Sequence, residues 1–259
     1  MDTKILLKNA IAWAHEAGKI HLKHFRSTNI NIEYKLNAAD IVTIADKESE
    51  TCILQHIKTT YPTHSILSEE SGANITNSDY CWVIDPLDGT TNYSQGLPLF
   101  AVSIGIKYKG ETIIGVVYAP YLDEMFYAVK GEGAFLNGNQ ISSSLKTELS
   151  QIVVATGFPV DKGTNKDNNL NNFSKIMPQV RGIRRLGAAA LDLCYVASGI
   201  LDAYWEMNLH EWDVCAGQLI AEESGALVTH FRFDRNISII AAPSSIHSQL
   251  LSLILNNDE

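Results

Sequence analysis

The chain has 259 residues, of which 46% are hydrophobic and 19% are charged, and its formal net charge is −9. This length allows a large core, either in one domain or in two lobes that share a core. The negative charge argues against broad electrostatic binding to polyanions, so we expect neither nucleic acid nor a membrane as a partner.

The N-terminal segment gives no sign of a targeting sequence. It begins Met1-Asp2-Thr3-Lys4 and lacks the basic stretch, long apolar run and cleavage site of a secretory signal. No apolar run approaches the roughly 20 residues that span a bilayer. The four cysteines are scattered without paired spacing, which is typical of thiols in a reducing compartment. We therefore expect a cytoplasmic location.

Two helices are predicted in the first 60 residues. Apolar and small residues recur at helical spacing across 3–26, among them Leu7, Ile11 and Ala14. A second helix is predicted from about Thr43 to Thr60, and Pro62 should end it.

The pattern then changes to strands and, later, to alternating strands and helices. Short apolar segments separated by Gly and Asp turns predict an antiparallel sheet, at 65–67, 80–84, 99–107, 111–119 and 124–129. Beyond residue 150, strands are predicted at 152–155, 201–206, 226–229 and 237–241, helices at 187–198, 212–224 and 244–255, and a loop at 161–172. This alternation favours an α/β lobe. We expect an N-terminal lobe over 1–146 and a C-terminal lobe over 147–259.

The segment Asp85-Pro86-Leu87-Asp88-Gly89-Thr90-Thr91-Asn92 carries most of the chemical information. It follows an apolar run, 81–84, that reads as a buried strand, and its two aspartates are three residues apart across a turn. Carboxylates bind hard cations, and free N–H groups at a Gly-rich turn bind phosphate oxygens. One loop thus offers a metal site beside a phosphate site, although Asp, Pro and Gly also form plain turns.

Three further acidic segments help to decide between a metal site and a plain turn. Glu69 and Glu70 follow a short predicted strand, where they form either a solvated loop or a site at the strand end. Asp46 and Asp213 each lie at the start of a predicted helix, where capping alone would explain an aspartate.

Read together, these segments resemble the inositol monophosphatase family of metal-dependent, lithium-sensitive phosphatases. The resemblance extends from about Asp40 to Ala242. It rests on five segments in order, which are Asp-Ile-Val-Thr-Ile-Ala-Asp at 40–46, Glu-Glu-Ser at 69–71, 82–92, 187–194 and Trp-Asp-Val-Cys-Ala-Gly at 212–217. It implies an α/β (layered α+β) fold of the sugar-phosphatase type, an αβαβα sandwich with an antiparallel N-terminal sheet and a mixed C-terminal sheet.

The resemblance also implies a binding site for two or three Mg²⁺ ions. Glu69, Asp85 and the backbone carbonyl of Leu87 would bind the first ion. Asp85, Asp88 and Asp213 would bind the second, with Asp85 bridging, and Glu69 would share a weaker third ion.

Catalytic and substrate roles follow from the same resemblance. Thr90, paired with Asp46 and with Glu70 nearby, would orient and deprotonate the attacking water. The implied substrate contacts are Asp88, Gly89, Thr90, Thr91, Ala189, Glu206 and Asp213, with the backbone N–H groups of Gly89 and Thr90 on the phosphate.

The implied function is Mg²⁺-dependent hydrolysis of a phosphomonoester by in-line attack of a metal-activated water. An inositol or sugar phosphate is the expected substrate, inositol 1-phosphate above all, and a homodimer is the expected assembly. Fructose-1,6-bisphosphatase, NADP phosphatase and adenosine bisphosphate phosphatase activities stay open, because Lys162, Lys166, Arg184 and Arg185 could meet a second phosphate. So does a function of another class, a regulatory RNA-associated protein on a phosphatase fold.

Overall fold

The computed structural model describes residues 2–27, 30–35 and 40–255. The helices are α1 (Thr3–His24), α2 (Ile44–Thr60), α3 (Thr90–Ser94), α4 (Leu170–Ile176), α5 (Ala189–Ala197), α6 (Glu211–Glu223) and α7 (Ser244–Leu255). The strands are β1 (Glu33–Tyr34), β2 (Ile41–Val42), β3 (Ser65–Ser68), β4 (Gly72–Asn74), β5 (Tyr80–Asp88), β6 (Ala101–Tyr108), β7 (Glu111–Ala119), β8 (Glu124–Val129), β9 (Ala134–Leu136), β10 (Asn139–Ile141), β11 (Val153–Thr156), β12 (Gly182–Arg184), β13 (Ala203–Leu209), β14 (Leu227–Arg232) and β15 (Ile237–Ala242).

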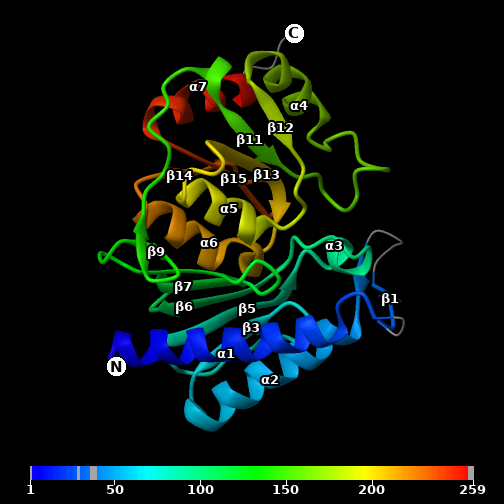
Figure 1. Cartoon of the computed structure of the whole chain (residues 1–259), viewed down its shortest axis with the longest axis vertical. Helices are drawn as coiled ribbons and strands as arrows, with labels where there is room; N and C mark the ends of the chain where they lie inside the picture. Colours follow the sequence, from blue (N-terminus) through cyan, green and yellow to red (C-terminus); the bar gives the residue numbers. More distant parts are fainter. Residues whose placement is uncertain (1, 28–29, 36–39, 256–259) are drawn as a thin grey trace.

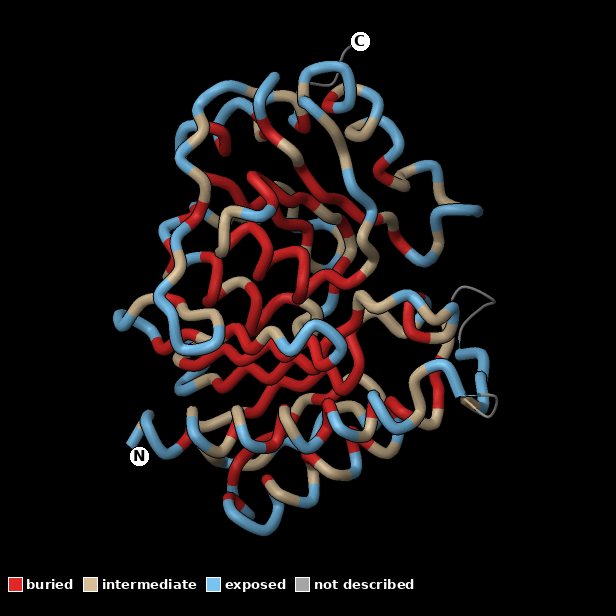
Figure 2. Tube along the Cα trace, viewed as in Figure 1, coloured by how far each residue is buried: buried red, intermediate tan, exposed pale blue. Residues whose placement is uncertain are grey.

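Five layers are stacked along the long axis of the molecule (Figure 1). Helices α1 and α2 cover one face of an eight-stranded sheet, α5 and α6 lie between the two sheets, and α4 and α7 cover the outer face of a five-stranded sheet. Apolar clusters fill the spaces between the layers, and buried segments concentrate in the sheets and the central helices (Figure 2). The expected αβαβα sandwich is therefore confirmed.

The eight-stranded sheet has the order β10-β9-β8-β7-β6-β5-β3-β4. Adjacent strands in this sheet pair antiparallel, as expected, with one exception. Strands β3 and β5 run parallel, with Ser68 opposite Ile84. Parallel strands end at the same edge of a sheet, so the residues that follow Ser68 and Ile84 are brought together. This pair, which the sequence pattern did not reveal, positions the acidic site described below.

The five-stranded sheet has the order β12-β11-β13-β15-β14 and is mixed, as expected. Strand β11 pairs parallel with β12 and β13, whereas β15 pairs antiparallel with β13 and β14. The first sheet uses residues 65–141 and the second uses 153–242. The division of the chain at 146/147 into two lobes remains a prediction.

The predicted helices and strands match observed elements, but several short elements were missed. Helix α3 follows Gly89 inside the predicted metal and phosphate loop. Helix α4 begins at Leu170, within the predicted loop 161–172, so the last three residues of that loop are helical. No helix within the described ranges is both long and apolar enough to cross a membrane.

Close packing of α6 on the first sheet gives a stability prediction. A Cβ atom added at Gly115 in β7 would lie 2.5 Å from the carbonyl oxygen of Ala216 in α6. Gly115→Ala should therefore destabilise the protein by about 1–3 kcal/mol, the usual cost of overpacking. Each kcal/mol lowers Tm by roughly 2–4 °C in a chain of this size. Gly163→Ala is the control, because an added Cβ there meets nothing within 4 Å. Equal Tm values for the two variants, measured by calorimetry, would contradict this packing.

Candidate active site

The site begins where the parallel strands β3 and β5 end. The backbone N–H of Glu69 donates to the carbonyl of Ile84 at 3.1 Å, which holds Glu69 beside Asp85. Asp85 is buried, and its Oδ1 accepts the N–H of Leu87 at 3.0 Å. The backbone between Asp85 and Asp88 therefore forms a short turn that is closed by the Asp85 carboxylate.

Asp88 reaches the C-terminal half of the chain. Its carboxylate accepts the backbone N–H groups of Ala189, Ala190 and Leu191 at 3.0, 2.8 and 3.3 Å. These groups form the first turn of α5, whose N-cap residue, Ala188, has no side chain that could cap the helix. Asp88 thus serves as the capping carboxylate of a helix about a hundred residues away in sequence.

Asp213 joins the cluster from the first turn of α6. Its Oδ2 accepts the backbone N–H of His210 at 2.7 Å, so the capping role that the sequence left open is present. The Asp213 charge also raises the pKa values of Asp85 and Asp88, which places it near both carboxylates. Capping and membership of the acidic cluster are therefore compatible.

The carboxylates disfavour one another's ionised forms. Burial, followed by the charges of Glu69, Asp88 and Asp213, raises the pKa of Asp85 well above its usual range. Burial and Asp213 raise the pKa of Asp88 to about 8, against the effect of its three backbone donors. No ion pair among the described residues supplies Asp85 or Asp88 with a cationic partner.

This donor set fits a hard divalent cation. Glu69, Asp85, Asp88 and Asp213 offer carboxylate oxygens, and Leu87 offers a backbone carbonyl. Oxygen ligands are those that Mg²⁺ prefers, and a cation would offset the repulsion that raises the carboxylate pKa values. The metal assignments remain predictions, and the chemistry of the residues agrees with them.

Thr90 connects the acidic loop to helix α2. Its Oγ1 lies 2.9 Å from Asp46 Oδ1 and 3.0 Å from the carbonyl oxygen of Leu87. The other oxygen of Asp46 accepts from the backbone N–H of Thr43 at 2.8 Å and so caps α2. Burial raises the pKa of Asp46, although hydrogen bonds from Thr43 and Thr90 oppose the shift. Each carboxylate oxygen of Asp46 thus has its own role.

Lys35 forms ion pairs with Glu69 and Glu70. Its Nζ lies 2.8 Å from Glu69 Oε1 and 2.5 Å from Glu70 Oε1. Burial alone would lower its pKa, but Glu69 and Glu70 outweigh burial and leave the pKa above its usual value. Burial and the charge of Glu69 raise the pKa of Glu70 to about 7, against the effect of Lys35. The sequence did not predict these two ion pairs.

The predicted substrate-binding residues are distributed over strand β13 and helix α3 as well as the acidic cluster. Glu206 on β13 accepts a hydrogen bond from the Tyr204 hydroxyl at 2.7 Å, and burial raises its pKa to about 7. An added Cβ at Gly157 would lie only 2.0 Å from the Glu206 carboxylate oxygens, so this glycine leaves room for the carboxylate. Gly89, with φ +87°, begins α3, whereas Thr91 is exposed on α3.

Two buried residues behind the site were missed in the sequence. His21 Nε2 lies 2.9 Å from the carbonyl of Pro86, and burial lowers its pKa to about 3, so the ring is neutral and donates. Asp192 on α5 is buried, and neither of its oxygens has a hydrogen-bond partner among the described residues. Burial, then Glu206 and Asp88, raise its pKa well above the usual range. Both residues lie in helices that were predicted from the spacing of their apolar residues, and this pattern gives no reason to single out His21 or Asp192.

Comparison with known proteins identifies the family. The model of the inositol monophosphatase family matches residues 2–258. The chain belongs to the inositol monophosphatase family. This is a family of phosphatases, so the acidic cluster lies in a fold that is used for phosphate ester hydrolysis.

Relatives of the chain carry two kinds of name. The Haemophilus influenzae protein named Nus factor SuhB is 41% identical over 254 residues, which cover 96% of this chain and 95% of that protein. The structure of the extragenic suppressor protein suhB from Bartonella henselae has 36% identity and a TM-score of 0.91, covering 98% of this chain and 100% of that one. The inositol monophosphatase structure from Anabaena has 37% identity and a TM-score of 0.87, covering 98% and 97%.

The raised carboxylate pKa values give a pH prediction for the metal-free protein. Groups whose pKa is higher in the folded state bind more protons there, so stability falls as the pH rises. The free energy of unfolding in a chelator should fall from about pH 4, where free carboxylates titrate, to about 8, the folded value of Asp88. Urea denaturation across this range measures the slope. Asp88→Asn should reduce the slope and saturating Mg²⁺ should remove it, whereas stability that increases with pH would contradict the assignment.

Proposed function

We propose that this protein is a Mg²⁺-dependent phosphomonoester hydrolase that acts on an inositol phosphate or a related sugar phosphate. The observation that carries the proposal is the convergence of Glu69, Asp85, Asp88 and Asp213 from both halves of the chain into one oxygen-donor cluster, in which the pKa values of Glu69, Asp85 and Asp88 are raised. Membership of the inositol monophosphatase family supports it. Magnesium, when bound, would supply positive charge for the phosphate and lower the pKa of a nearby water.

The residues around the cluster suit the attack of water on phosphorus. Thr90 can donate its hydroxyl proton to Asp46, which leaves lone pairs on the Thr90 oxygen to accept a hydrogen bond from water. Because its pKa is raised by burial, the Asp46 carboxylate accepts a proton more readily than an ordinary aspartate does. Glu70, held by Lys35, is a second carboxylate in this region. The reaction would proceed in line, without a covalent intermediate.

Polar groups in and around the cluster support the proposed substrate class. Glu206 is fixed by Tyr204 and would accept hydrogen bonds from ring hydroxyls of a cyclitol or sugar. Asp88 and Ala189, already hydrogen-bonded to each other, would face hydroxyls next to the phosphate. Burial raises the pKa of Glu206 and the charge of Arg185 opposes this shift, so a positive charge lies near the carboxylate. This charge could meet a second phosphate, so bisphosphates remain candidate substrates. Phosphate release from a panel of inositol, sugar and nucleotide phosphates ranks these substrates.

Metal dependence is the first test of this function. A chelator should abolish phosphatase activity, and added Mg²⁺ should restore it. Asp85→Asn should lower kcat by more than about 100-fold, the scale on which loss of one preorganised electrostatic contact acts. Asp79→Asn is the matched control, because Asp79 is an exposed aspartate just before β5. Near-normal turnover in Asp85→Asn would remove the basis of the proposal.

Thr90 provides the test of the mechanism. Thr90→Ala should lower kcat by roughly 10²–10⁴-fold, the usual contribution of acid–base assistance, with a much smaller change in KM. Thr90→Ser keeps the hydroxyl and should retain most of the activity. Steady-state kinetics on both variants separate the roles, and an unchanged kcat with a large increase in KM would show that Thr90 only binds substrate.

Lithium inhibition is a finer proposal about the second ion site. Li⁺ has half the charge of Mg²⁺ and a similar size, so it could occupy the position bounded by Asp85, Asp88 and Asp213 while product phosphate stays bound. Inhibition should be uncompetitive with substrate. Assays in LiCl, NaCl and KCl of equal ionic strength distinguish this from screening, since equal losses of rate in the three salts would refute it.

The relatives named Nus factor SuhB favour a second candidate function, a role in transcription. The net charge of −9 opposes non-specific binding to RNA but does not oppose binding to a protein. Surface plasmon resonance with RNA and with RNA polymerase, in separate arms, tests this role. Binding that persists in Asp85→Asn would make it independent of catalysis, and no binding in either arm would argue against it. Light scattering tests the expected homodimer in the same samples.

A further inference from the structure

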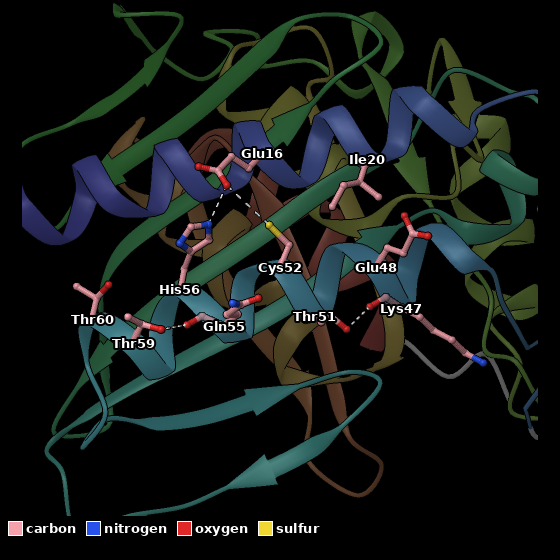
Figure 3. Close-up of a pocket in the computed structure, with 10 residues that line it drawn as sticks. All are labelled: Glu16, Ile20, Lys47, Glu48, Thr51, Cys52, Gln55, His56, Thr59 and Thr60. Atoms are coloured by element: carbon pink, nitrogen blue, oxygen red, sulfur yellow. Dashed lines mark hydrogen bonds and ion pairs between the residues drawn. The ribbon is translucent and has the colours of Figure 1, made fainter.

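A second group of metal-ligating side chains lies outside the acidic cluster, in the layer formed by α1 and α2. Glu16 extends from α1, and Cys52 and His56 extend from α2 toward it (Figure 3). The group lines a surface cavity of about 780 Å³. None of the residues that line this cavity belongs to the carboxylate cluster.

The three side chains are arranged as ligands of one ion would be. Glu16 Oε2 lies 2.8 Å from His56 Nε2 and 3.9 Å from Cys52 Sγ, and one ligand atom from each residue lies within 4.8 Å of the other two. A tetrahedral zinc site, with bonds of about 2.0–2.3 Å, separates its ligand atoms by roughly 3.3–3.8 Å. Small side-chain rotations would bring the observed separations to these values.

Local structure holds these ligands in place. Cys52 and His56 are four residues apart on α2, so they share one face of the helix. The His56 ring stacks on Trp13, with centroids 5.4 Å apart and planes at 7°. Trp13 is buried and packs on Trp82, so it fixes the plane of the imidazole. The stacked imidazole therefore has little freedom to turn away from Glu16 and Cys52.

Donor type distinguishes this group from the acidic cluster. A thiolate, an imidazole and a carboxylate together favour Zn²⁺ and similar transition ions, whereas a site with only oxygen donors favours Mg²⁺. The Glu16 and His56 side chains are 46% and 37% exposed, so water can reach the ion and complete its coordination. The metal-free alternative is that Glu16 only pairs with His56 and accepts a weak hydrogen bond from the Cys52 thiol, and the cobalt titration below distinguishes the two.

We propose that Glu16, Cys52 and His56 bind one transition-metal dication of the Zn²⁺ class, with water as the fourth ligand. The thiol proton of Cys52 would be released to solvent as the sulfur–metal bond forms. The ion ties α1 to α2 through one ligand from the first helix and two from the second. Its effect is to stabilise the outer helical layer of the eight-stranded sheet.

Cobalt is the probe that tests the site directly. Metal-stripped protein is first saturated with Mg²⁺ to occupy the oxygen-donor cluster and is then titrated with Co²⁺. A thiolate-to-cobalt charge-transfer band should grow and saturate at one equivalent per chain. Cys52→Ser should abolish the band. Cys81→Ser is the matched control, a partly buried free cysteine on β5, and should retain it.

Stability provides an independent readout. Zn²⁺ should raise the Tm of the wild type and of Cys81→Ser by mass action, and it should leave the Tm of Cys52→Ser unchanged. His56→Gln and Glu16→Gln should weaken Co²⁺ binding by at least about 10-fold, on the scale of altered metal sites. No charge-transfer band in the wild type, or a band that persists in Cys52→Ser, would overturn the proposal.

Discussion

The contact between Asp88 and the first turn of α5 is the interaction on which the arrangement of the site depends. A carboxylate at the end of β5 accepts three backbone N–H groups of a helix whose own N-cap residue is an alanine. Unsatisfied N–H groups at a buried helix end are costly. The helix can therefore dock with its first turn satisfied only where Asp88 lies. Docking in this position brings β13 and α6, and with them Glu206 and Asp213, toward the carboxylates of the first sheet.

The parallel pairing of β3 with β5 is the second constraint. It aligns the ends of two strands, so Glu69 and Asp85 lie side by side although their sequence separation is sixteen residues. The cluster is electrostatically unfavourable without a cation, as the raised pKa values of Asp85 and Asp88 indicate. The fold tolerates this repulsion because strand pairing and helix capping hold the backbone independently. Strain of this kind is typical of a site whose geometry serves a ligand rather than stability.

Much of the fold could be predicted from local patterns, because helical and strand periodicity are local properties. The long helices at 3–24 and 44–60 and five of the eight strands of the first sheet were predicted, whereas the three-residue strands β4, β9 and β10 were missed. The acidic loop was evident from residue types and spacing, and the family resemblance supplied the roles of its residues. The partners of Asp88 and the pairing of Lys35 with Glu69 were not evident, because they join segments far apart in sequence. Helix α3 was missed because five residues are too few to show a period.

The hydrogen bonds of Thr90 imply an order of events when the site binds its ligands. A hydroxyl carries one proton, yet Thr90 Oγ1 lies within donating distance of both Asp46 Oδ1 and the Leu87 carbonyl. The two acceptors therefore compete for one donor, and the hydroxyl divides its time between two directions. Any group that takes up the lone pairs of the Leu87 carbonyl would leave the proton directed at Asp46. Only then would the oxygen of Thr90 keep one fixed orientation toward water. Binding of a group at the Leu87 carbonyl would therefore come before the Thr90 hydroxyl is fixed in its hydrogen bond to Asp46.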